Sequence, residues 1–228
     1  SNFRSGGQFD NTAWAAFAQA TYDVTDRLHL TLGGRYTDED KSFTPDQIIY
    51  NNYYAGFSNL VPPGNPLAAL DAPFLQAGSR ILPLLEKEIS ISEFTPMANL
   101  AFDLSDRTMI YLTYSEGFKS GGFTQRVFPP VVAGFTAPPG TPDIDLIPTY
   151  EPEFVEVIEA GIKLDLLDGR LRINGAVFQT DYEELQVQVF NSVAPVTRNI
   201  GEASIEGVEL EVSASPADGW FIEGSLSM

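Results

Sequence analysis

The sequence has few of the residues that build catalytic and metal centres. Among its 228 residues there is no cysteine and a single histidine, His29. Zinc is held mainly by cysteine and histidine side chains, so this composition argues against a zinc site. The chain also lacks a Walker loop, a nucleophile elbow and an HExxH helix. We therefore expect no cofactor and no enzymatic activity.

Basic residues are scarce as well. Lysine and arginine total 13 against 31 aspartates and glutamates, which gives a formal net charge of −18 and a pI near 4.2. A nucleic-acid partner requires basic side chains that neutralise phosphates. The composition therefore excludes nucleic acid as a partner.

Long apolar runs are missing too. No stretch of about 18 apolar residues is present, so the sequence predicts no transmembrane helix. Membrane barrels built from strands remain open, because their apolar residues alternate with polar ones instead of forming a run. Hydrophobic residues make up 43% of the chain, which excludes a disordered protein.

Strict alternation is what the sequence offers instead. In Leu28–Tyr36, apolar residues and glycine occupy the even positions, and mostly polar residues occupy the odd ones. This two-residue period is typical of a strand with two unlike faces. The preceding segment around Trp14–Tyr22 alternates in the same way, and a short polar turn at Asp26 separates the two. The pair predicts a β-hairpin.

The same unit recurs three more times. Alternating segments flank short turns at Asp106, Asp168 and Asp218, which gives eight strands in four hairpins. The connections between hairpins are Asp38–Ser92, Glu116–Pro152 and Asn191–Arg198, and the first two are long. Short turns at one end of the strands and long loops at the other are typical of outer-membrane barrels, where the long loops are extracellular and the turns periplasmic.

Aromatic residues recur at a spacing that suits a membrane. Trp14 and Tyr22 share one apolar face eight residues apart, and so do Phe94 and Phe102. Eight strand residues span about 27 Å, close to the ~25 Å apolar band between aromatic girdles once the strands tilt. Tyr36 and Tyr114 would join one girdle. A soluble β-sandwich with these aromatics in its core is the alternative.

The polar face carries charged residues that would point into the lumen of such a barrel. In a sandwich the same residues would form the solvent-facing side. The residues in question are Arg35, Glu159, Lys163, Arg172, Glu209 and Glu211.

Four stretches resemble the TonB-dependent receptor family. They are Gly33-Gly34-Arg35-Tyr36-Thr37-Asp38-Glu39, Tyr111–Phe123 with its Gly-Phe-Lys-Ser-Gly-Gly-Phe ending, Tyr150–Lys163 with a Glu-x-Gly-x-Lys strand, and Asn199–Glu211 with a Gly-x-Glu-x-Glu strand. They occur in the family's order and together cover essentially the whole chain.

The resemblance implies an all-β, antiparallel, up-and-down transmembrane barrel segment in the bacterial outer membrane. Such receptors have about 22 strands and a plugged lumen, so residues 1–228 would be a partial barrel without the plug domain and the barrel C-terminus. It further implies TonB-energised import of a scarce, bulky nutrient such as a ferric siderophore. Its partners would be outer-membrane lipid, the TonB complex through the missing plug, and the small-molecule cargo. The alternative is a secreted β-sandwich that binds carbohydrate.

Ligand contacts, if this chain makes any, are expected from the loop Phe118–Phe135. The loop combines aromatic surface with a cation, and binding residues gather on loops held by a rigid scaffold. Packing of the phenylalanines against neighbouring segments is the alternative. The candidate residues are Phe118, Phe123, Arg126, Phe128 and Phe135.

Overall fold

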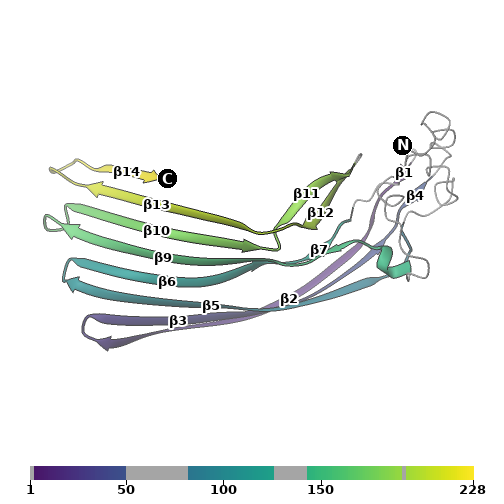
Figure 1. Cartoon of the computed structure of the whole chain (residues 1–228), viewed down its shortest axis with the longest axis horizontal. Coiled ribbons are helices and arrows are strands. Elements are labelled where there is room, and N and C mark those ends of the chain that lie inside the picture. Colours follow the sequence, from purple (N-terminus) through teal and green to yellow (C-terminus); the bar gives the residue numbers. More distant parts are fainter. Residues whose placement is uncertain (1–2, 50–81, 126–142, 192–193) are drawn as a thin grey trace.

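A computed structural model describes residues 3–49, 82–125, 143–191 and 194–228. Eight strands form one antiparallel sheet in the order β14-β13-β10-β9-β6-β5-β3-β2 (Figure 1). Strands that are adjacent in this sheet are also consecutive in the chain among these eight. Their bounds are β2 Gly7–Thr25, β3 Leu28–Pro45, β5 Lys87–Ser105, β6 Thr108–Lys119, β9 Glu153–Leu166, β10 Leu171–Glu183, β13 Ala203–Ala214 and β14 Ile222–Ser227.

The predicted all-β, up-and-down arrangement is confirmed. The eight strands form four hairpins whose short turns contain Asp26, Asp106, Asp168 and Asp218, and all four turns lie at one end of the sheet (Figure 1). The sandwich alternative requires a second sheet packed on the first, and the described residues form no such sheet. The three remaining sheets have two strands each.

The strand ends near the long connections were predicted wrongly. β3 and β5 stay paired as far as Phe43 opposite Lys87, well inside the segment 38–92 that the sequence predicts as a loop. The connection 191–198 is not a simple loop either, because β11 (Gln186–Asn191) and β12 (Ala194–Asn199) pair there as a further hairpin.

Short elements complete the fold. β1 (Phe3–Arg4) pairs with β4 (Ile48–Ile49), and β7 (Gly122–Phe123) pairs with β8 (Thr149–Tyr150). A single turn of 3₁₀ helix, η4, spans Asp143–Leu146. Within the described ranges, no helix is long and apolar enough to cross a membrane.

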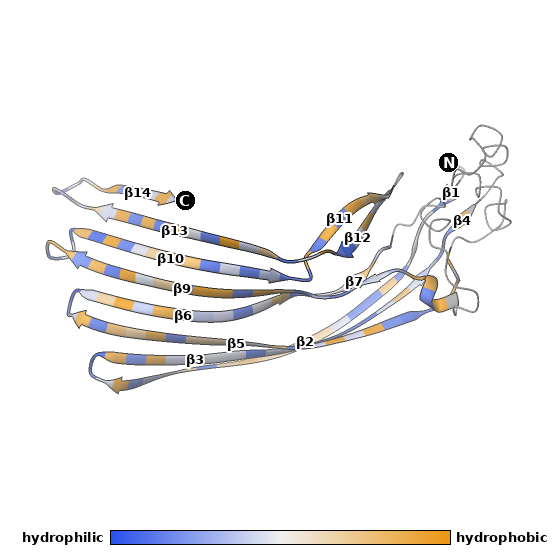
Figure 2. Ribbon diagram, viewed as in Figure 1, coloured by the Kyte–Doolittle hydropathy of each residue, from blue (hydrophilic) through white to orange (hydrophobic). Residues whose placement is uncertain are grey.

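The register assigns every side chain of the sheet to one of two faces. We call the face that carries Leu30, Leu100 and Ile162 the outward face, and the face that carries Thr31, Asn99 and Glu159 the inward face. Figure 2 shows the resulting alternation of apolar and polar residues along β9 and β10. Large apolar side chains on the outward face remain uncovered, as contact with lipid requires.

The aromatic residues of the outward face are exposed near both ends of this apolar zone. Trp14 is 55% exposed, Phe94 60% and Tyr22 69%. Trp14 and Tyr36 contact each other with ring centroids 5.4 Å apart. We call Trp14, Tyr36, Phe94 and Tyr114 the upper girdle.

Beyond the upper girdle the two faces exchange character without a register slip. The outward face of β3 continues with Asp38 and Asp40, which accept hydrogen bonds from Ser92 at 2.6 Å and Ser90 at 2.7 Å. The inward face of the same strand turns apolar and includes Phe43, which is 2% exposed. The alternation therefore continues while its polarity reverses.

Substitutions on the two faces should differ strongly in their effect. Arginine in place of Leu32, on the outward face between the exposed aromatics of the two ends, should lower folding yield because a basic residue facing lipid costs about 2–4 kcal/mol at mid-bilayer. Thr31→Arg, its neighbour on the inward face, should fold nearly as well as the unaltered protein. Folding yields into lipid vesicles measure both. Equal yields for the two variants would remove the assignment of the faces.

Candidate functional site

All six charged residues predicted for the polar face lie on the inward face of the sheet. Arg35 directly opposes Thr95 of β5. Asn174 directly opposes both Lys163 and Glu211, one on each side. The remaining three are Glu159, Arg172 and Glu209, at inward positions of β9, β10 and β13. That this face borders a lumen stays a prediction.

Tyr111 explains the spacing of the Glu-x-Gly-x-Lys stretch in β9. The Tyr111 hydroxyl donates to the Glu159 carboxylate at 2.6 Å, and the Lys163 ammonium lies 5.4 Å from the centre of the tyrosine ring. Between them, Gly161 directly opposes Tyr111, and a Cβ atom there would lie 2.5 Å from the ring. Glu159, Gly161 and Lys163 thus hold the side chain of Tyr111 against the sheet, and we call these three residues the tyrosine seat.

Gly207 in β13 repeats this arrangement. It opposes Phe178 of β10, whose ring would lie 2.5 Å from a Cβ atom at residue 207. An aromatic ring over a cross-strand glycine covers backbone that the missing side chain leaves open. The inward face therefore holds its large side chains flat against the sheet.

Above the polar zone, segments 120–125 and 143–150 fold onto the inward face. Phe123 of β7 contacts Phe43 with ring centroids 5.6 Å apart, and Phe9 at 6.4 Å. Ile147 is fully buried in the same cluster. The Lys87 ammonium donates to the Ile147 carbonyl at 3.0 Å, which ties the segment after η4 to β5.

A buried charge pair fastens the end of β6 to β3. The Lys41 ammonium lies 2.8 Å from the Glu39 carboxylate and donates to the Gly121 carbonyl, also at 2.8 Å. The Ser120 hydroxyl accepts from Lys41 and donates to Glu39 at 2.7 Å. Both charged side chains are largely buried, at 10% and 17% exposure. We call Glu39, Lys41 and Ser120 the latch.

Two amide side chains join the β11–β12 hairpin to the same region. Gln186 donates to the carbonyls of Lys119, Ser120 and Glu151. Asn199 donates to the carbonyls of Glu151 and Glu184, and its own oxygen accepts from the Glu151 amide at 2.8 Å. Hydrogen bonds therefore hold the hairpin against the ends of β6, β9 and β10.

Two of the five predicted ligand residues lie in the described part of the chain. Phe118 belongs to β6, where it opposes Phe154 at an outward, half-buried position. Phe123 is only 5% exposed and packs in the cluster with Phe43. Phe123 thus packs against a neighbouring segment, the alternative to ligand contact, because the polarity reversal makes the inward wall of β3 apolar there. Arg126, Phe128 and Phe135 lie outside the described residues.

In the ranges that the structure covers, no group of three or more histidine, cysteine or acidic side chains could hold a metal ion. The one histidine, His29, bridges Asp23 and Asp103 near the turn end of the sheet. The sequence alone predicted neither the latch nor the tyrosine seat, although the Glu-x-Gly-x-Lys spacing marks the seat.

Comparison with known proteins gives a consistent result. The family model for the TonB dependent receptor-like β-barrel matches residues 1–227. The chain is 34% identical over 78 residues to a probable TonB-dependent siderophore receptor of Acinetobacter baumannii, covering 34% of this chain and 10% of that protein. It is 24% identical over 212 residues to the ferric-pyoverdine 358 receptor of Pseudomonas putida, covering 90% and 20%.

The fold has a counterpart among solved structures. The ferric yersiniabactin uptake receptor of Yersinia pestis superposes with a TM-score of 0.67 at 18% identity, over 99% of this chain and 28% of that one. At this identity the likeness concerns the fold alone. The chain spans about a tenth and a fifth of the lengths of the two curated relatives that it matches.

Lowering the pH should weaken the contacts that Glu39 makes with Lys41 and Ser120 in the latch. Hydrogen bonds from Lys41 and then Ser120 hold the pKa of Glu39, beyond the girdle, below its usual range. Because the folded pKa is the lower one, the stabilisation is present above about pH 4.3. It is lost as pH falls through the folded pKa. Acidification below about pH 4.3 should therefore progressively raise amide exchange around Gly121, whose carbonyl accepts from Lys41.

The matched control is Glu39→Gln, which keeps the side-chain shape and cannot titrate. Hydrogen exchange of both proteins, read by mass spectrometry at each pH, cancels the intrinsic effect of pH on exchange. The excess acid response should vanish in the glutamine variant. The same response in both proteins would show that Glu39 titration does not control this segment.

Proposed function

The chain belongs to the TonB-dependent receptor β-barrel family, and from that premise we propose that it forms part of the wall of a receptor that binds and imports a ferric siderophore. Members of this family are outer-membrane proteins of Gram-negative bacteria, and the family comprises receptors rather than enzymes. The match of the family model over residues 1–227 carries the proposal. Exposed apolar residues on the outward face support it independently.

The siderophore is the finer part of the proposal. The two curated relatives are named as siderophore receptors, one of them for ferric pyoverdine. Because the chain spans a small part of each, we propose residues 1–228 as a partial barrel domain whose plug and closing strands belong to the rest of the receptor. TonB would act through that plug, and the proton gradient of the inner membrane would supply the energy.

The inward face suits a wall that guides cargo. Its lower part presents charged and amide side chains, including Arg35, Glu159 and Lys163. Its upper part is covered by the segments that the latch and the Phe123 cluster hold in place. Phe123 therefore acts as an anchor for the segment that follows it, and cargo contact is proposed for Arg126, Phe128 and Phe135.

Replacing those three residues by alanine should reduce uptake at least tenfold while leaving the barrel folded. The assay supplies radiolabelled ferric pyoverdine and ferric yersiniabactin to iron-limited cells that express the receptor as their sole siderophore receptor. Alanine at Phe190, which is 80% exposed in the β11–β12 hairpin, is the matched control. Unchanged uptake in the triple variant would remove these residues from the site, and failure of the unaltered receptor to import any chelate would contradict siderophore import.

A further inference from the structure

The sheet contains an open seam between β5 and β6. Their pairing ends at Met97 opposite Ser115. Beyond that point β5 continues to pair with β3 as far as Lys87, and β6 continues to pair with β9 as far as Lys119. Each strand thus keeps one neighbour and loses the other, and the two edges diverge toward the loop end of the sheet.

Pro96 explains where the seam begins. The Asp103 amide donates to the Arg27 carbonyl on the β3 side. Since amides alternate direction along a strand and the β3–β5 register runs without a shift, position 96 would donate toward β6. Proline has no N–H to donate. The pairing of β5 with β6 therefore ends at Met97, the residue next to Pro96.

The seam leaves strand edges of the kind that accept another strand. The even-numbered residues of β5 from Phe94 to Glu88 direct their backbone groups toward it, and on β6 so do Glu116 and Phe118. No strand pairs with these edges among the residues that the structure describes. Unpaired edges are templates for strand addition.

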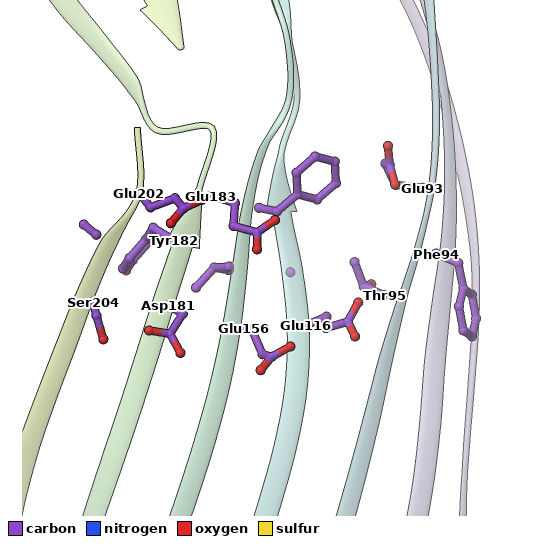
Figure 3. Close-up of a pocket in the computed structure, with 14 residues that line it drawn as sticks. Glu93, Phe94, Thr95, Glu116, Glu156, Asp181, Tyr182, Glu183, Glu202 and Ser204 are labelled. Carbon is purple, nitrogen blue, oxygen red and sulfur yellow. The ribbon is translucent and has the colours of Figure 1, made fainter. Parts of the chain in front are cut away.

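A cavity of about 550 Å³ lies against the seam. Figure 3 shows Thr95 and Phe94 on one side of the gap and Glu116 and Glu156 on the other. Acidic side chains dominate its lining, and none of the lining residues is a lysine or an arginine. The acids are Glu93, Glu116, Glu156, Asp181, Glu183 and Glu202.

Three of these acids form a continuous row across the outward face. Glu116 directly opposes Glu156, and Glu156 directly opposes Asp181. Like charges in directly opposed positions destabilise a sheet. The Tyr114 hydroxyl contacts both Glu116 and Glu156 but brings no positive charge. A cation from outside the described wall would relieve this repulsion.

We propose that the seam binds an extended, lysine- or arginine-rich peptide segment of another protein, which adds as a strand to the edge of β5. Its backbone would pair with the free edge, and its basic side chains would face Glu116, the member of the row next to the seam. Glu156 and Asp181, one and two strands further across the sheet, would add to the negative field that attracts the segment. The features that carry this assignment are the unpaired edge and the charge of the cavity. A second copy of this chain, at −18, and an anionic lipid headgroup both carry the wrong charge.

Fluorescence anisotropy with the full receptor in lipid nanodiscs tests the proposal. The probe is a labelled ten-residue peptide of alternating lysine and valine, and its counterpart has glutamate in place of lysine. The lysine peptide should bind at about 50 mM NaCl and weaken as salt rises, since charge attraction is screened. The glutamate peptide should not bind. Binding of both or of neither overturns the proposal.

Two comparisons separate strand addition at the seam from general attraction. Glu116→Gln/Glu156→Gln/Asp181→Asn should weaken the lysine peptide at least tenfold. Asp10→Asn/Asp38→Asn/Asp40→Asn, which removes three charges from the outward face of β2 and β3, away from the seam and the row, should change affinity less than twofold. A lysine peptide with alternate backbone nitrogens methylated should bind the unaltered receptor at least tenfold more weakly. Equal losses in the two variants, or equal binding of the methylated peptide, would overturn the proposal.

Discussion

The unbroken register between β3 and β5 is the constraint on which the rest of the structure depends. In a strand, side-chain direction repeats every two residues, so a ladder without a slip fixes the face of every residue from one end to the other. β3 and β5 pair over their whole shared length without a shift. The same geometric face therefore meets lipid beside Leu30 and water beside Asp40, and the amino-acid composition changes with the surroundings.

The position of the reversal explains which parts of the fold were predictable. Within the apolar zone the outward face is apolar and the inward face is polar, as a barrel wall requires, and all four hairpins were predicted from this alternation. Beyond Tyr36 the apolar residues move to the odd positions, as Phe43 does, so a search for one continuous apolar face ends the strand too early. The paired backbone continues because hydrogen bonding does not depend on which face is apolar.

The inward site was harder to predict for a related reason. Its contacts join residues far apart in the chain, such as Lys41 with Gly121 and Phe43 with Phe123. Periodicity places each of these residues on a face but does not show which distant segment will cover it. For Phe123 the sequence therefore left ligand contact and packing open, and the apolar upper wall of β3 buries it.

The seam and the latch are two consequences of one divergence. Because β6 no longer pairs with β5 beyond Ser115, its continuation is free to cross the inward side of the sheet, and Lys41 holds Ser120 and Gly121 against β3. Had residue 96 carried an N–H, pairing with β5 would extend β6 along the wall and compete with this crossing. A single missing donor at Pro96 thus has two effects. It leaves a strand edge beside an acidic cavity, and it lets the segment that carries Phe123 reach the inward face.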